Sequence, residues 1–225
     1  MEIEKCRLCG EANTSLLSIP SKRLFRCKNC DFIFAAKSSL PRIDDEKSRY
    51  LKHNNTELEY EKYFENKLEA LSSELDLDFK SSTTVLDYGS GPSNILEKVF
   101  RKNYSLQISS YDSIFSPIDL PVCEYDYIFC IETAEHFHNP SYEFEKLKRL
   151  LKNNRDSMII IETGMTDSFF GEDKELDNMK LSTWWYLRDV THVGFYCEKS
   201  VRVLAHSLGM KYQIMDNQRG FVLGF

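Results

Sequence analysis

The chain has 225 residues and a mass of 26.4 kDa; 42% of the residues are hydrophobic and 28% are charged. This composition suits one globular domain with a small appendage and excludes a disordered or collagen-like chain. The formal net charge is −6, but residues 1–50 carry ten Lys and Arg against seven Asp and Glu, so the rest of the chain is acidic. The acidic remainder would repel a nucleic-acid backbone, and we therefore disfavour nucleic-acid substrates.

The sequence contains no candidate membrane span. Its longest apolar runs, such as residues 158–161 and 221–225, are far shorter than the roughly 18 residues that a membrane helix needs. The N-terminus also lacks the basic start, apolar stretch and cleavage site of a secretory signal. We therefore expect a cytoplasmic protein with no membrane partner.

Two C-x-x-C pairs stand near the N-terminus, at Cys6-Arg-Leu-Cys9 and Cys27-Lys-Asn-Cys30. The 17 residues between them are typical of a four-thiolate tetrahedral zinc site. Four thiolates close the coordination sphere, so the expected role of the metal is structural. Iron in a rubredoxin-like site is the alternative, because it uses similar pairs.

Residues 1–40 are accordingly predicted to form a zinc-ribbon module, closed by a short strand at residues 31–34. Its positive charge is concentrated at Lys22, Arg23, Arg26 and Lys28. We interpret this patch as solvated surface, with the docking of a protein or RNA as the alternative. Residues 41–80 are predicted to be a helical linker or lid, with an amphipathic helix over about 56–77. The acids at 44–46 and the charged residues at 57–69 are interpreted as solvated surface.

Strand and helix patterns alternate through residues 81–225, the predicted main domain. Strands are expected at 81–87, 106–111, 125–131 and 156–162, helices at 94–102, 141–151 and 198–208, and a closing hairpin at 211–215 and 221–225. This alternation predicts an α/β fold with a doubly wound, mostly parallel, Rossmann-like sheet. The continuous apolar run at 158–161 predicts that its strand is central.

A glycine turn, Asp87-Tyr-Gly-Ser-Gly-Pro-Ser93, follows the first of these strands. Gly89 and Gly91 allow a tight turn and the close approach of a ligand at the start of a helix. Asp112 ends the next strand, 25 residues after Asp87, where a carboxylate accepts hydrogen bonds from a ribose. A dinucleotide fingerprint needs a third glycine where Asn94 stands, so a nicotinamide-dependent reductase is a minor alternative.

The turn resembles the D-x-G-x-G signature of class I S-adenosylmethionine-dependent methyltransferases. The segment from Tyr125 to His136, with its E-x-x-E-H ending, resembles the fourth strand of that family. The four-cysteine module and residues 184–196 resemble bacterial methyltransferases that carry an N-terminal zinc-binding module and act on diverse small molecules. The resemblance implies an S-adenosylmethionine site formed by these residues: Asp87, Gly89, Gly91, Asp112 and Glu132.

The acceptor side is predicted from the fourth strand and the tryptophan-rich segment. His136 and His192 are the candidates for the base that removes the acceptor's proton. Four aromatic residues are candidates for the acceptor pocket, with core packing as the alternative: Trp184, Trp185, Tyr186 and Tyr196. Glu132 or Glu135 is alternatively expected to cap the helix that begins near Pro140.

One departure from the family concerns adenine. Only twelve residues separate Asp112 from Tyr125, too few for the usual helix and complete third strand. The candidates for an apolar surface against the adenine ring are instead Ile114, Phe115 and Pro117. The leading interpretation is methyl transfer to a small-molecule acceptor by in-line displacement; methylation of a protein or RNA and a non-catalytic module are the alternatives.

Overall fold

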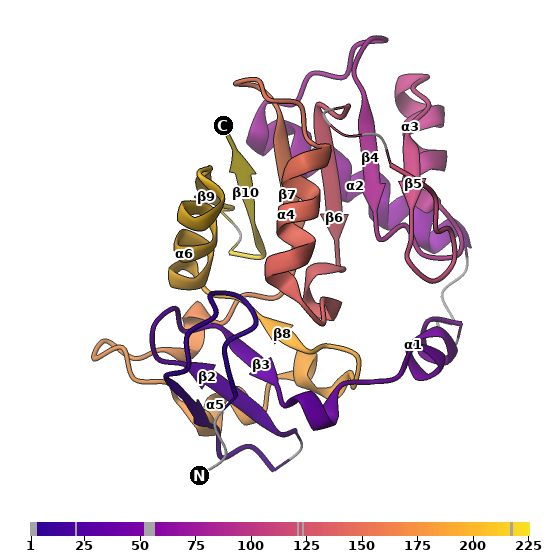
Figure 1. The fold of residues 1–225 in the computed structure, drawn as a ribbon. Helices are drawn as coiled ribbons and strands as arrows, with labels where there is room; N and C mark the ends of the chain where they lie inside the picture. Colours follow the sequence, from indigo (N-terminus) through magenta and orange to yellow (C-terminus); the bar gives the residue numbers. More distant parts are fainter. Residues whose placement is uncertain (1–3, 21, 52–56, 121, 123, 217) are drawn as a thin grey trace.

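The larger part of the chain is built on a six-stranded sheet, in the order β5-β4-β6-β7-β10-β9 (Figure 1). The computed structural model describes residues 4–20, 22–51, 57–120, 122, 124–216 and 218–225. The strands are β4 (Val85–Tyr88), β5 (Ser109–Tyr111), β6 (Tyr127–Ile131), β7 (Met158–Glu162), β9 (Lys211–Ile214) and β10 (Gly220–Gly224). The first four pair in parallel, and β10 runs antiparallel to both β7 and β9.

Helices cover both faces of this sheet. One face packs against α2 (Glu57–Leu75) and α3 (Ile95–Tyr104), and the other against α4 (Pro140–Leu150) and α6 (Glu198–Leu208). All five residues of β6 are buried, and they alternate between the two cores: Phe129 packs with α3, and Ile128 packs on the opposite side. Burial on both faces explains the continuous apolar runs. The predicted α/β, doubly wound, mostly parallel fold is confirmed, and β7 lies inside the sheet as expected.

A smaller antiparallel sheet carries the cysteines. It consists of β1 (Thr14–Leu16), β2 (Leu24–Cys27), β3 (Ile33–Ala35) and β8 (Gly194–Phe195), in that order. The fourth strand comes from the tryptophan-rich segment, because Ile33 pairs with Phe195 and Phe34 with Gly194. One face of this sheet packs against a core to which η3 (Asp167–Phe169), α5 (Asn178–Ser182) and η4 (Trp185–Arg188) contribute. The division at residue 40 remains a prediction, and the sheet of the module extends beyond it.

The segment predicted as a helical linker contains α1 (Ile43–Tyr50) and α2, and η1 (Lys37–Ser39) immediately precedes it. The start expected near Thr56 lies outside the described residues. Leu68 and Leu71 of α2 are buried in the core, as an amphipathic helix requires, whereas Leu58 is exposed. The expectation that the charged residues at 44–46 and 57–69 are solvated is wrong for Glu46, which is buried, and for Lys67, whose side chain is 10% exposed. In the part of the chain that the structure describes, no helix has the length and hydrophobicity to span a membrane.

An ion pair ties α2 to the centre of the sheet. The Lys67 and Glu162 side chains, 10% and 6% exposed, contact each other, and the Lys67 amine also lies 4.5 Å from the centre of the Tyr63 ring. Burial raises the pKa of Glu162, and Lys67 opposes that rise. Removing the cation would therefore leave a buried carboxylate without compensation.

We predict that Lys67→Ala lowers the free energy of unfolding by about 3–5 kcal/mol near pH 8. The loss should shrink near pH 5, because a buried carboxyl with a raised pKa favours the folded state only while it is protonated. Urea unfolding at the two pH values measures this. Lys102→Ala, which removes an exposed ion pair with Glu65, is the control and should leave stability almost unchanged. Equal losses of unfolding free energy in the two variants would contradict a stabilising role for the buried Lys67–Glu162 pair.

Candidate active site at the carboxyl ends of the parallel strands

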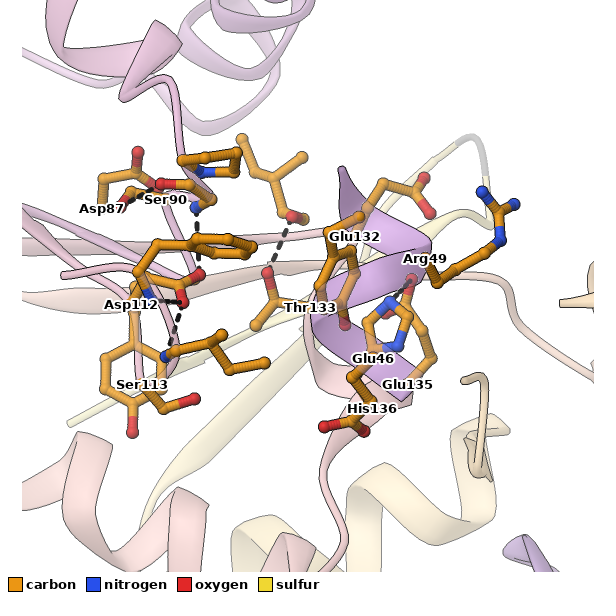
Figure 2. A pocket seen from close by; sticks show the side chains of 18 of the residues that line it. Glu46, Arg49, Asp87, Ser90, Asp112, Ser113, Glu132, Thr133, Glu135 and His136 are labelled. Atoms are coloured by element: carbon orange, nitrogen blue, oxygen red, sulfur yellow. Dashed lines mark hydrogen bonds and ion pairs between the residues drawn. The ribbon is translucent and has the colours of Figure 1, made fainter. Parts of the chain in front are cut away.

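A cavity of about 1320 Å³ lies where the parallel strands β4, β5 and β6 end. The loops after these strands line it together with α1 and residues 185–192. Figure 2 shows Asp87 and Asp112 at one end and Glu132, Glu135 and His136 at the other. The predicted cofactor and base residues therefore meet in one cavity.

The turn after β4 requires glycine at position 89. Gly89 has a φ of 92°, and a Cβ atom there would lie 2.3 Å from the Thr133 side chain. The amides of Gly89 and Ser90 donate to the Tyr111 carbonyl at 2.8 and 3.0 Å, which fixes the turn to the end of β5. Gly91 also has a positive φ, 63°, but a Cβ there would meet no atom within 4 Å. The turn thus presents open backbone to the cavity.

The two aspartates at this end are held differently. Asp112 accepts hydrogen bonds from the backbone amides of Gly91 at 3.0 Å, Ile114 at 2.8 Å and Phe115 at 2.9 Å, so its carboxylate is fixed at the cavity wall. Asp87 is buried, and burial together with the negative charges of Asp112 and Glu97 raises its pKa to about 7. A bound cation would relieve that cost. This end of the cavity therefore suits a ligand with a ribose and a positive group.

Two glutamates and one tyrosine form a buried network at the opposite end. The Tyr186 hydroxyl donates to Glu132 at 3.0 Å and also contacts Glu135, whose second oxygen accepts from Thr163 at 2.9 Å. Burial and the neighbouring carboxyl raise the pKa of Glu132 to about 7, and burial also raises that of Glu135. The capping alternative is wrong for both glutamates, because Asn139 is the N-cap of α4.

His136 and His192 lie side by side, with ring centres 4.8 Å apart. Each Nδ1 lies within hydrogen-bond distance of a backbone carbonyl, that of Thr191 at 2.9 Å for His136 and that of Tyr186 at 2.8 Å for His192. This anchoring assigns the proton to Nδ1 and leaves both Nε2 atoms as acceptors. They lie 3.9 and 4.0 Å from the same oxygen of Glu135, a donor set that also suits a divalent cation.

The four predicted acceptor aromatics separate into two pairs. Trp185 and Tyr186 line the cavity. Trp184 and Tyr196 lie outside it: Trp184 packs against Phe169 and Phe195, and Tyr196 is fully buried with its hydroxyl donating to the Ala134 carbonyl at 3.0 Å. Core packing, the alternative considered for all four, describes this second pair.

Sequence reasoning missed the contribution of α1 to the cavity. Tyr50 lies edge-on to His136, with ring centres 5.4 Å apart, and Glu46 contacts the His138 imidazole at 2.9 Å. A short helix rich in charged residues gives no signal of this placement. Of the residues considered for adenine, Ile114 and Phe115 line the cavity and Pro117 does not. In the described residues β5 is the edge of the sheet, as the short segment after Asp112 indicated.

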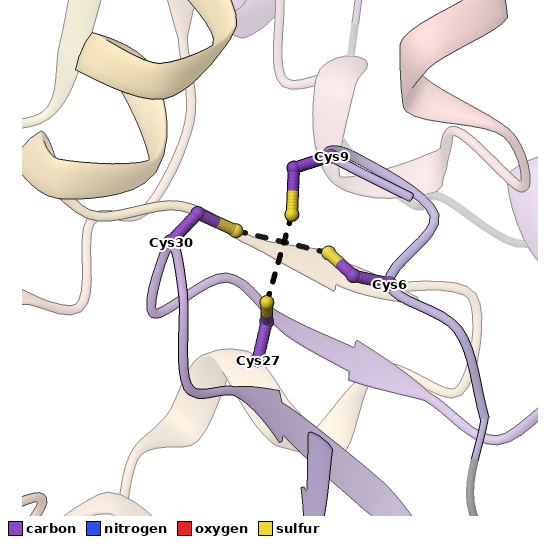
Figure 3. A group of neighbouring side chains, drawn as sticks. All are labelled: Cys6, Cys9, Cys27 and Cys30. Carbon is purple, nitrogen blue, oxygen red and sulfur yellow. Dashed lines mark hydrogen bonds between the residues drawn. The ribbon is translucent and has the colours of Figure 1, made fainter. Parts of the chain in front are cut away.

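The four predicted metal ligands converge in the N-terminal module. Figure 3 shows Cys6, Cys9, Cys27 and Cys30 with their sulfur atoms directed toward a common centre. The Sγ atoms of Cys6 and Cys30 are 3.7 Å apart, and those of Cys9 and Cys27 are 3.6 Å apart. Metal–sulfur bonds of about 2.3 Å in a tetrahedron place sulfur atoms about 3.8 Å apart. The four residues therefore fit one tetrahedral ion.

We predict that His192 does not titrate between pH 5.5 and 8 and that His136 titrates below the ordinary histidine value. Burial lowers the pKa of both imidazoles, that of His192 to about 3, so His192 is neutral throughout this range and the neutral form of His136 is favoured. Proton–nitrogen NMR of the imidazole groups measures this, with assignments from His136→Gln and His192→Gln. A titration of either signal near pH 6.5 would contradict the burial and hydrogen bonding described.

Comparison with known proteins places this architecture in a family. A family profile described as "Methyltransferase domain" matches residues 56–213. A search of curated proteins found no match, whereas 315 chains of solved structures match.

Three of these solved structures illustrate the similarity. The phosphoethanolamine N-methyltransferase 2 of Haemonchus contortus, in complex with phosphomonomethylethanolamine and S-adenosylhomocysteine, is 14% identical with a TM-score of 0.55; the match covers 77% of this chain and 46% of that one. The plantazolicin methyltransferase BpumL is 19% identical (TM-score 0.48, covering 76% and 73%). The YcgJ protein of Bacillus subtilis is 16% identical (TM-score 0.46, covering 65% and 70%).

The family match spans most of the main sheet and reaches from α2 to β9. The fold of the Haemonchus enzyme agrees with the doubly wound sheet described above. The expected resemblance to methyltransferases is thereby confirmed, and the chain belongs to the methyltransferase-domain family.

Proposed function

We propose that this protein transfers the methyl group of S-adenosylmethionine to a small-molecule acceptor. The observation that carries the proposal is the single cavity, which has a fixed carboxylate and a glycine turn at one end and two neutral imidazoles at the other. An enzyme of this class mainly aligns the acceptor with the methyl group and excludes water. Both tasks need such a two-ended site.

The cofactor would lie along the turn after β4. Asp112 would accept the ribose hydroxyls, Asp87 would favour the ammonium group, and Gly91 would allow close approach of the ligand to the backbone. Ile114 and Phe115 offer the apolar face for adenine. The Haemonchus neighbour, which has the same fold, binds S-adenosylhomocysteine, and this supports the cofactor class. When bound, the cofactor supplies an electrophilic methyl group on a positively charged sulfur.

The acceptor would bind between the cofactor and the wall of Glu132, His136 and His192. These residues would hold the acceptor with its nucleophilic atom facing the methyl carbon, and on transfer the electrons of the carbon–sulfur bond would remain on sulfur. The proton of the acceptor passes to Nε2 of His136 or of His192, both held in the accepting tautomer. Tyr186 and Trp185 would contact the acceptor from the side.

Methylation of a docked protein or RNA loses support from the placement of the basic residues. Lys22 donates to the carbonyls of Asp189 and His192, and Arg26 is 7% exposed and pairs with Asp31 at 2.8 Å. Two of the four cations of the expected patch are therefore turned into the protein. A docking surface for phosphates needs exposed cations.

Zinc is the metal that we propose for the four-cysteine site. We predict one colourless metal ion per chain by elemental analysis, and a loss of that ion in Cys27→Ser. Cys130→Ser, which changes a buried cysteine outside the cluster, should retain it. A red protein containing iron would contradict zinc.

The cofactor proposal predicts saturable binding of S-adenosylhomocysteine in isothermal titration calorimetry. Asp112→Ala should weaken binding at least about 100-fold, because ribose hydroxyls lose a charged acceptor. Asp119→Ala, an exposed carboxylate outside the cavity, is the matched control. No binding by folded wild-type protein would favour the non-catalytic alternative.

The pH dependence tests Asp87 separately. Because the pKa of Asp87 is about 7 in the free protein and an ammonium group favours the ionised form, affinity should increase as the pH rises from 6 to 8, by up to about tenfold per unit. Asp87→Asn should bind more weakly and lose this dependence. An unchanged pH profile in that variant would remove Asp87 from the cofactor site.

A further inference from the structure

The four-cysteine module contacts the acceptor wall through one arginine. Arg7 lies between Cys6 and Cys9, and its guanidinium donates to three backbone carbonyls: those of His138 at 2.8 Å, Ala35 at 2.9 Å and Val193 at 3.1 Å. Its own carbonyl accepts from the Ser141 amide at the start of α4. The planar fork of arginine suits several acceptors in fixed positions. Two of those acceptors belong to the segments that carry His136 and His192.

Val193 is held on both sides. Its carbonyl also accepts from the Ala35 amide of the module at 2.9 Å, and its own amide donates to the Glu135 carbonyl at 2.7 Å. The next residue, Gly194, belongs to β8 and lies against Phe32, since a Cβ there would be 2.9 Å from that ring. The module, Val193 and the Glu135–His136 turn thus form one hydrogen-bonded series.

A second cation of the module holds the same loop. The Lys22 amine donates to the carbonyls of Asp189 at 2.6 Å and His192 at 2.5 Å. These carbonyls bracket the residues that precede Val193, and Thr191 among them accepts the His136 Nδ1 proton. The positions of both imidazoles therefore depend on contacts made by residues 7–35.

The cofactor end has different supports. The hydrogen bonds that fix Gly89, Gly91 and Asp112 run to Tyr111, Ile114, Phe115 and one another, all within the main sheet and its loops. Loosening of the module should therefore affect the two ends of the cavity unequally.

We propose that Arg7 is a positioning residue that couples the four-cysteine site to the acceptor end of the cavity and leaves the cofactor end unaffected. The coupling follows from its place in the first C-x-x-C pair: the backbone there is ordered by the thiolate–metal bonds, and metal binding contributes to local folding. Metal loss then displaces the guanidinium and releases the carbonyls of His138 and Val193. The term acceptor end rests on the proposed function; the coupling to His136 and His192 does not.

The test compares Arg7→Ala with Lys5→Ala, an exposed cation on the other side of Cys6. Three measurements are made on each full-length, metal-loaded protein: metal content, S-adenosylhomocysteine affinity, and the NMR signals of the His136 and His192 imidazoles with the exchange rate of the Val193 amide. In Arg7→Ala we expect one metal per chain and an affinity within about twofold of wild type. We expect Val193 exchange at least about tenfold faster and a His192 pKa that moves upward toward 6.5. Lys5→Ala should match wild type throughout.

A second experiment removes the metal from the wild-type protein with a thiol reagent and a chelator. It should produce the same changes in the imidazole signals and in Val193 amide exchange as Arg7→Ala. Unchanged imidazole signals and Val193 exchange in Arg7→Ala would overturn the proposal. Joint loss of affinity and imidazole signals would also overturn it, because the module would then support the whole fold. If wild-type protein fails to bind S-adenosylhomocysteine, the proposed function fails, but the imidazole and exchange measurements still decide the coupling.

Discussion

The parallel pairing of β4 with β5 and β6 is the constraint on which the rest of the site depends. It brings the loops after three strands to one edge, so that Asp87, Asp112 and Glu132 share a cavity although they are far apart in the sequence. The pairing is close enough that Gly89 and Thr133 leave no room for a side chain between them. The residues proposed to hold the cofactor and those proposed to face the acceptor are therefore placed by the same strand contacts.

Electrostatics divides the cavity into two functional ends. At the first end, burial and the nearby carboxylates make ionisation of Asp87 unfavourable, and a positively charged ligand would offset this cost. The second contains neutral imidazoles and a Glu132–Glu135–Tyr186 network in which burial favours the protonated carboxyl. In the proposed reaction, a positively charged cofactor would occupy the first end and a proton-releasing acceptor the second, so the methyl group would be transferred from the first end toward the second.

Local patterns in the sequence predicted most of the fold. Alternating apolar runs located the strands and helices of the main sheet, and the glycine turn and the E-x-x-E-H ending located both sides of the cavity. Contacts between distant segments were not predictable. Strand β8 has two residues, too few for a recognisable pattern, so its pairing with β3 was missed. Trp184 and Tyr196 could not be separated from Trp185 and Tyr186, because which aromatic side chains are buried depends on contacts with distant segments. A single sequence also gives no signal of buried polar contacts, such as those made by these residues: Arg7, Lys22, Glu46 and Lys67.

A crystal structure of the protein with S-adenosylhomocysteine tests the central claim most directly. The account predicts the ribose hydroxyls within hydrogen-bond distance of Asp112, the ammonium group near Asp87 and the sulfur atom facing the space before His136 and His192. Density for the ligand elsewhere, or a sulfur atom directed away from the two histidines, would contradict the proposed methyl transfer.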